Sequence, residues 1–240
     1  MLAADVPLHL RTNRSRQAPL ALCTGDPDRA RLVAREILDD AQRVTSARGL
    51  LGFTGRHRGV PVTVQATGMG GGSTAIVAHE LIELGARVLV RAGSCGGLQA
   101  DLALGELVVC ERALADDGAG LALAGPVAPA PDAGLVASLH AAAGASGRPA
   151  RGGTVVSTDL FYDPDPARPR APRWQEAGCV AVEMEAAVLL ALCARHGARG
   201  GCITYVSNRL VGEPAWVGGR EFRLLGLEVC AAALDALVSA

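Results

Sequence analysis

Short apolar runs typical of buried strands alternate along the whole chain with segments of helical periodicity, and this alternation most limits the folds open to the sequence. The predicted strands are 20–23, 60–66, 88–90, 107–110, 154–157, 179–182 and 202–206, and the predicted helices are 28–38, 74–84, 132–143, 186–196 and one from about 219. We expect irregular segments at 113–131, which is rich in Ala, Gly, Pro and Asp, and at 158–173. Alternation of this kind predicts an α/β fold whose ligand loops follow the strand ends.

The length and composition favour one domain and a small ligand. The chain has 240 residues, half of them hydrophobic, which is enough for one large core, so we expect a single domain over residues 1–240. The formal net charge is only -1 and blocks of like charge are absent. The sequence therefore gives no electrostatic reason to expect nucleic acid or an acidic membrane as a partner.

Lysine does not occur in the sequence, so every permanently charged basic side chain is an arginine. The planar guanidinium group is well suited to bidentate contacts with phosphate. The absence of lysine also excludes enzyme classes that need one, such as those with a Walker-type phosphate loop or a pyridoxal Schiff base.

The seven cysteines predict reduced thiols in a core rather than disulfides. They are odd in number, scattered and without C-x-x-C spacing. This usage is typical of a cytoplasmic protein. No basic-then-apolar leader opens the chain, and each apolar run is broken by Gly or a charge before it reaches spanning length, so we expect neither secretion nor membrane insertion.

Three glycine-rich turns are predicted directly after apolar runs, at 24–27, 67–72 and 91–97. Glycine allows backbone N–H groups to approach an anion closely, and the N-terminus of a following helix attracts negative charge. Ser73 is placed to cap the helix after the second turn. Because that turn lacks the G-x-G-x-x-G spacing, a dinucleotide site is the weaker alternative to a phosphate site.

Two carboxylates, Glu183 and Glu185, lie inside the otherwise apolar segment 179–187. A buried carboxylate without partners costs several kcal/mol, so these two groups need cations or hydrogen-bond donors. They are either ion-paired structural residues or part of a binding site. The glycine-rich turns and the arginines near them favour the binding site.

Six segments carry a resemblance to a known family over nearly the whole chain. They are Gly25-Asp-Pro-Asp-Arg29, Arg48-Gly-Leu-Leu-Gly-Phe-Thr-Gly55, Gly68-Met-Gly70, Arg91-Ala-Gly-Ser-Cys-Gly96, Ser157-Thr-Asp-Leu-Phe-Tyr162 and Val182-Glu-Met-Glu-Ala-Ala187. In this order they resemble the nucleoside phosphorylase family, in the hexameric bacterial branch that includes purine nucleoside phosphorylase and uridine phosphorylase. The resemblance implies a central mixed β-sheet flanked by helices.

The resemblance also implies an activity and a set of site residues. The activity is that of a pentosyltransferase: inorganic phosphate cleaves the N-glycosidic bond of a nucleoside, giving the free base and (deoxy)ribose 1-phosphate in nucleoside salvage. The implied phosphate-binding residues are Gly25, Arg29, Arg48, Arg91 and Ser94, with Arg48 supplied by a neighbouring subunit. The implied nucleoside-binding residues are His9 of the neighbour, Met69, Phe161, Val182, Glu183, Met184, Glu185, Ser207, Asn208 and Arg209.

Within that set the resemblance gives individual roles. Met184 and Glu185 would hold the ribose, with Glu183 less important, while Phe161 and Val182 would flank the base. A subunit would then need its neighbour, which makes a dimer the smallest active unit of a homo-oligomer such as a hexamer. No metal or organic cofactor is implied, because phosphate is a co-substrate.

The departure from the family pattern lies at Ser207-Asn208-Arg209. Purine enzymes of this branch typically have Asp at the second position, where it donates a proton toward N7 of the base, whereas Asn can donate only a hydrogen bond. Asn followed by Arg is similar to uridine phosphorylases. The short loop after Tyr162, without their Gln-x-Arg pair, favours purines. Arg220 is implied as the supporting cation beside Asn208 and Glu185 in catalysis.

Purine nucleosides are therefore the expected substrates, and uridine is the alternative. Two further alternatives come from other classes. A nucleosidase that uses water would not need Arg29, Arg48 and Arg91 together. A catalytically impaired nucleoside-binding paralogue would account for Asn208.

Overall fold

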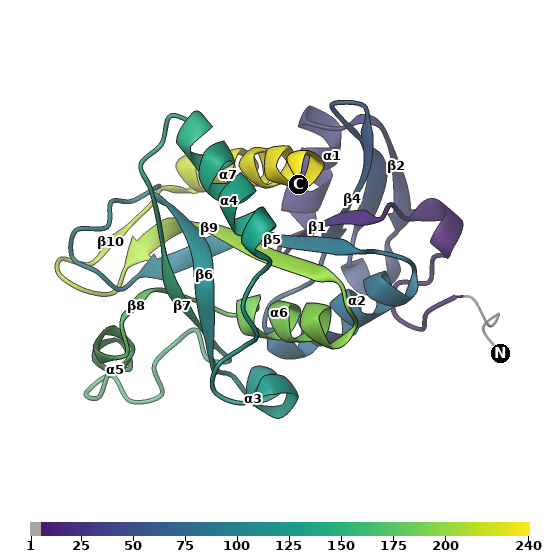
Figure 1. Ribbon diagram of the computed structural model, residues 1–240. Helices are drawn as coiled ribbons and strands as arrows, with labels where there is room; N and C mark the ends of the chain where they lie inside the picture. The colour runs from purple at the N-terminus through teal and green to yellow at the C-terminus, as the bar shows by residue number, and fades with distance from the viewer. Residues whose placement is uncertain (1–5) are drawn as a thin grey trace.

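The computed structural model describes residues 6–240 as one mixed ten-stranded sheet with helices on both sides (Figure 1). The strands are β1 (Leu20–Thr24), β2 (Asp39–Thr45), β3 (Gly52–His57), β4 (Val60–Ala66), β5 (Val88–Gly97), β6 (Leu107–Asp116), β7 (Ala150–Thr158), β8 (Cys179–Glu183), β9 (Arg199–Arg209) and β10 (Ala215–Trp216). The helices are α1 (Pro27–Glu36), α2 (Gly71–Glu83), α3 (Gly118–Ala124), α4 (Ala133–Ala145), α5 (Ala171–Glu176), α6 (Ala186–Arg195) and α7 (Gly219–Ser239), with short 3-10 turns at Arg14–Arg16 and Ala47–Gly49.

The strand order is β10-β9-β6-β7-β8-β5-β1-β4-β3-β2, and an additional pairing of β9 with β5 closes five of these strands into a ring. β5 is parallel to β9 along its whole length. Its other edge pairs with β1 up to Arg91 and with β8 from Gly96. Residues 92–95 thus have no strand partner on that edge within the described chain. An interrupted edge at the carboxyl ends of parallel strands is where α/β sheets bind ligands.

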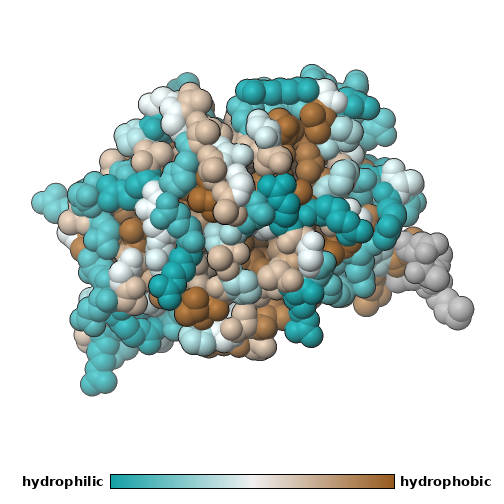
Figure 2. Space-filling model, in the orientation of Figure 1, coloured by the Kyte–Doolittle hydropathy of each residue, from teal (hydrophilic) through white to brown (hydrophobic). Residues whose placement is uncertain are grey.

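The helices form two layers (Figure 1): α1, α4 and α7 cover one face of the sheet, and α2, α3 and α6 cover the other. A hydrophobic cluster lies under each layer. On the face that Figure 2 shows, hydrophobic patches are interleaved with hydrophilic residues. None of the helices in the part of the chain that the structure describes combines the length and hydropathy that a membrane span requires.

The expected α/β fold with a mixed sheet is confirmed, and so are the seven buried cysteines without disulfides. Three expectations are wrong. The predicted turn at 91–97 is the second half of β5, because β9 and β8 supply hydrogen-bond partners to this glycine-rich stretch. The predicted irregular segment 113–131 contains the end of β6 and all of α3. Ser73 does not cap α2, which begins after Gly70; its hydroxyl donates to the carbonyl of Thr67 instead.

Candidate active site

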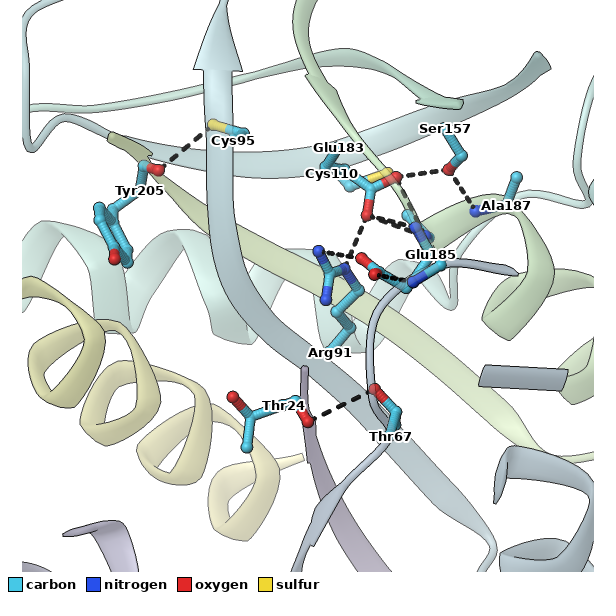
Figure 3. Close-up of polar contacts among 12 residues, drawn as sticks. Thr24, Thr67, Arg91, Cys95, Cys110, Ser157, Glu183, Glu185, Ala187 and Tyr205 are labelled. Atoms are coloured by element: carbon cyan, nitrogen blue, oxygen red, sulfur yellow. Dashed lines mark hydrogen bonds and ion pairs between the residues drawn. The ribbon is translucent and has the colours of Figure 1, made fainter. Parts of the chain in front are cut away.

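Arg91, Glu183 and Glu185 form a buried cluster where β8 ends beside β5 and the start of α6 (Figure 3). Arg91 Nε lies 2.7 Å from Glu183 Oε2, and its Nη2 lies 2.5 Å from Glu185 Oε2. All three side chains are at most 6% exposed. The two carboxylates raise the pKa of Arg91 against the opposing effect of burial, so the guanidinium stays charged.

Glu183 organises the turn from β8 into α6. Its carboxylate accepts hydrogen bonds from the backbone N–H groups of Glu185 and Ala186 at 2.8 to 3.1 Å and from the hydroxyl of Ser157. A carboxylate at a helix N-terminus satisfies N–H groups that have no partner within the helix. Ser157 Oγ in turn accepts from the N–H of Ala187 at 2.9 Å. Glu183 therefore fixes both Arg91 and the start of α6.

Glu185 joins this cluster to the glycine-rich turn before α2. Its Oε1 accepts a 2.6 Å hydrogen bond from the N–H of Gly70. Gly68 and Gly70 have φ of 74° and 86°, which favours glycine at both positions. Burial raises the pKa of Glu185, and the charge of Arg91 opposes that shift. Met69 projects from the tip of the turn with 84% of its surface exposed.

The turn after β1 lies against the same glycine-rich turn. The N–H of Thr67 donates to the carbonyl of Thr24 at 2.8 Å, and its hydroxyl donates to the same carbonyl at 3.4 Å, the contact that Figure 3 draws. A Cβ on Gly25 would lie 3.3 Å from the carbonyl oxygen of Gly68. Gly25 is therefore adjacent to the loop that contacts Glu185. Ser94, half-buried, lies on the open edge of β5.

Arg29 is a buried cation without a carboxylate partner among residues 6–240. It is 8% exposed, and its nitrogens reach only Thr24 Oγ1 and Tyr205 Oη, each at 3.5 Å. The guanidinium carbon lies 5.8 Å and 5.6 Å from the ring centres of Tyr205 and Phe222. A Cβ on Gly226 of α7 would lie 2.7 Å from Arg29 Nε, so glycine there makes room for the side chain. Such a guanidinium has capacity for an anion.

Val182 and Asn208 lie on either side of Gly96 in the sheet, in register across β8, β5 and β9. Asn208 is 5% exposed, and the hydroxyl of Ser207 contacts both the carbonyl of Cys95 at 3.1 Å and Asn208 Oδ1 at 3.0 Å. The Nε of Arg209 is buried without a hydrogen-bond partner among the described residues. This sheet row brings together the residues expected at the base, whereas Phe161 lies outside it on the loop after β7.

Like Arg29 and Phe161, three further expected residues are not shown in contact with the Arg91 cluster within the described chain. Arg48 is exposed and has a φ of 57°, in the left-handed region. Arg220 is exposed in the first turn of α7. His9 lies at α2, where Glu80 accepts from His9 N at 3.0 Å and from Leu10 N at 2.7 Å and lies 2.6 Å from His9 Nδ1.

Sequence reasoning missed three supporting residues. Ser157 lies in one of the family segments but was given no role, and Glu80 has no local signal that marks it. Asp117 caps α3 by accepting from the N–H of Gly120 at 2.7 Å, and it is 1% exposed. A Cβ on Gly71 would lie 2.6 Å from its Oδ2, so Asp117 packs against the start of α2. Its Oδ1 has no described partner, and burial raises its pKa.

Among residues 6–240, no group of three or more His, Cys, Asp or Glu side chains has an arrangement that could hold a metal ion. The polar groups that converge are instead guanidinium, carboxylate, amide and backbone N–H. This set can bind an anion beside a polyhydroxylated ligand, because guanidinium and N–H donate hydrogen bonds and carboxylates accept them.

Comparison with known proteins gives one family and a consistent set of relatives. The model of the phosphorylase superfamily matches residues 19–239. A protein from Jannaschia sp. named purine nucleoside phosphorylase DeoD-type is 40% identical over 201 residues, covering 82% of this chain and 85% of the relative. Proteins with the same name from Roseobacter denitrificans and Caldanaerobacter subterraneus are 37% and 36% identical, covering 89% and 85% of this chain and 92% and 88% of the relatives.

Proposed function

Because the chain belongs to the phosphorylase superfamily, we propose that it is a purine nucleoside phosphorylase. It transfers the pentosyl group of a purine nucleoside to inorganic phosphate, which releases the free base and pentose 1-phosphate. The names of the relatives support purines over the uridine alternative. The nucleosidase and the impaired paralogue are likewise not favoured.

The observation that carries the proposal is that two buried carboxylates share the buried guanidinium of Arg91, next to the open edge of β5. Phosphorolysis needs a group that accepts hydrogen bonds from sugar hydroxyls next to a group that donates them to phosphate. Glu185 and Arg91 supply these two functions 2.5 Å apart. A sugar and a phosphate bound to this pair would therefore be neighbours, as a bimolecular displacement requires.

Phosphate binding rests on two arginines with unused capacity. Arg91 uses Nε and Nη2 for Glu183 and Glu185, and its Nη1, which would lie 3.0 Å from a Cβ on Gly93, has no hydrogen-bond partner among residues 6–240. Arg29 has no carboxylate partner in that same range. With the N–H groups near Gly25 and the hydroxyl of Ser94, they orient phosphate for attack on the anomeric carbon.

Catalysis follows from the charges that develop as the glycosidic bond lengthens. The sugar becomes cationic and the departing base anionic, so bound phosphate both attacks and stabilises the sugar. Glu185, supported by Met184, holds the ribose through its hydroxyls. Asn208 donates a hydrogen bond to the base, with Arg220 as the supporting cation; the amide cannot transfer a proton as a carboxylic acid does.

The complete site contains residues from two subunits in this proposal. Arg48 is exposed, and His9 is held at the surface of α2 by Glu80. We assign Arg48 to a neighbour's phosphate and His9 to a neighbour's sugar. A dimer is then the smallest active unit, and a hexamer is the assembly that the family resemblance implies.

Phosphate supplies both the nucleophile and the negative charge at the sugar, so the proposed reaction uses no metal or organic cofactor. Nucleoside salvage belongs to the cytoplasm, and seven buried thiols without a disulfide suit that reducing compartment.

The proposal is tested by assaying inosine, guanosine, adenosine and uridine with and without phosphate. We expect phosphate-dependent release of purine bases and formation of pentose 1-phosphate. Equal base release without phosphate would show a nucleosidase, and turnover of uridine alone would show the pyrimidine enzyme. Binding of nucleosides without any turnover would show an impaired paralogue.

A further inference from the structure

Trp216 is the outer member of the sheet row that contains the residues expected at the base. The row runs across four strands: Val182 of β8 pairs with Gly96 of β5, Gly96 with Asn208 of β9, and Asn208 with Trp216 of β10. Residues directly opposite each other on neighbouring strands project from the same face of a sheet. Trp216 therefore projects from the same face as Asn208, immediately beside it.

The middle of this row is lined by apolar side chains. Gly96 has no side chain, and a Cβ there would lie 3.0 Å from Leu210 Cδ1 and 3.2 Å from Val182 Cγ1. Leu210 and Val182 thus pack closely over Gly96, and Asn208 is the polar residue beside it in the row. Three strand spacings separate Val182 from Trp216, roughly 14 Å between Cα atoms.

Trp216 is also unusually exposed for its type. It is 60% exposed, and its nearest described ring is that of Phe161, 6.3 Å away at a tilt of 44° and itself 59% exposed. Burial of an aromatic ring is strongly favourable, so two exposed rings together form an attractive surface for another aromatic group. The rings come from segments far apart in the chain, the loop after β7 and the two-residue strand β10.

The other tryptophan shows the contrast. Trp174 is 6% exposed, its indole N–H donates to Asp116 Oδ2 at 3.0 Å, and Arg170 lies 5.0 Å from the ring centre. No such hydrogen bond fixes Trp216 within the described chain. Trp174 therefore has a structural role, whereas the side chain of Trp216 is free to contact a ligand.

We propose that Trp216 is a base-contacting residue that covers the outer side of the purine, opposite Val182 and beside Asn208. This inference rests on the proposed function, because it assumes that the ligand of this row is a purine. Trp216 adds stacking area without a hydrogen-bonding pattern. It therefore contributes affinity for any purine, and Asn208 supplies the polar contact with the base edge.

Since the chain has only two tryptophans, fluorescence tests the contact directly. In Trp174→Phe, Trp216 is the only emitter, and we expect hypoxanthine and inosine to change its emission saturably. In Trp216→Phe, Trp174 remains, and the change should disappear. Ribose 1-phosphate, which lacks a base, should leave both variants unchanged. A response that persists in Trp216→Phe, or that ribose 1-phosphate reproduces, would overturn the proposal.

Kinetics supply a second readout, which also serves if Trp174→Phe does not fold. Trp216→Ala should raise the nucleoside KM on the order of tenfold with the phosphate KM unchanged, and Trp216→Phe should recover much of the loss. An unchanged nucleoside KM in Trp216→Ala, with normal turnover, would overturn the contact and leave the proposed function intact. A base-dependent emission change without turnover of any nucleoside would instead support the contact and contradict the proposed function.

Discussion

The two ends of the candidate site differ in burial. At one end, the side chains of Arg91, Glu183 and Glu185 are buried and ion-paired. At the other end, which contains Asn208, the rings of Phe161 and Trp216 are more than half exposed. The first end is built on β5, β8 and the start of α6. The second depends on a long loop and a two-residue edge strand. In the proposed function the first is the sugar–phosphate end, which is preorganised for chemistry, and the second is the base end, which can adapt to the ligand.

The largest effect should come from the guanidinium that both carboxylates share. Arg91→Ala removes the charged donor to phosphate, so we expect turnover to fall by orders of magnitude and the phosphate KM to rise. Steady-state kinetics at varied phosphate, with circular dichroism as a control for folding, measure this. Wild-type-like phosphate kinetics in a folded Arg91→Ala enzyme would falsify the assignment of the preorganised end.

The two carboxylates should separate into different roles. Glu185→Gln keeps the shape but weakens acceptance from the ribose hydroxyls, and kcat/KM should drop roughly 10²-fold. Glu183→Gln should mainly lower the melting temperature, because Glu183 also accepts from the N–H groups that start α6. If Glu183→Gln is as stable as wild type and the more damaging to kcat/KM, the two roles are reversed.

A third test asks whether the sugar–phosphate end is complete within one chain. Arg48→Ala and Arg91→Ala subunits, each inactive, are refolded together. Some mixed sites then combine an intact Arg91 with an intact Arg48 from the neighbour, so partial activity should return. No recovery in mixed dimers verified by mass spectrometry would exclude Arg48 from the neighbour's site.

At the base end the expected effect on activity is smaller, and its direction depends on the substrate. Asn208→Asp supplies a group that can be protonated at the base, so purine phosphorolysis should rise several-fold, most visibly at mildly acidic pH where an Asp is partly protonated. With uridine the same change should be harmful, because it places negative charge beside the anionic leaving group. Assays of inosine and uridine across pH measure both effects, and no change with either substrate would place the Asn208 side chain away from the ligand.

The smallest effect concerns Asp117 beside the preorganised end. Burial raises its pKa above the unfolded value of 3.8, so the folded state binds the proton more tightly than the unfolded chain. Wild-type stability from this group is then present at low pH and lost as pH rises through the folded pKa. Asp117→Asn carries no such loss of stability, so its melting temperature should rise relative to that of wild type as the pH increases above 3.8. A difference that does not vary with pH would contradict this.

The sequence predicted the parts of the fold that local pattern controls. Apolar runs located β4 and the start of β5, but the continuation of β5 through Gly97 depends on pairing with β8 and β9, which are distant in the chain. β2 was missed because its first five residues are polar or exposed enough to lack a strand pattern. Pairing between distant segments determines such elements, and local propensity does not.

The same limit applies to the site. Arg91 and Glu183 are 92 residues apart, so spacing alone could not pair them. The family resemblance placed both in one site, Arg91 at the phosphate and Glu183 at the nucleoside, but did not predict their ion pair. The contacts of Glu80 and Asp117 are with segments distant in the chain: Glu80 accepts from the turn at His9, and Asp117 packs against the start of α2. Trp216 was missed because only the register between β9 and β10 places it beside Asn208.

The pairing of β5 on both of its edges also determines which parts of the site move. β5 belongs both to the closed ring and to the part of the sheet that contains β1 to β4. If its pairing with one group opens, its pairing with the other still holds it in place. Local opening begins at frayed edges such as β10 and reaches doubly anchored strands last. Local opening that releases Trp216 therefore leaves Arg91 in position. In the proposed function a ligand can then enter at the mobile edge around β10 while the reacting groups stay in place.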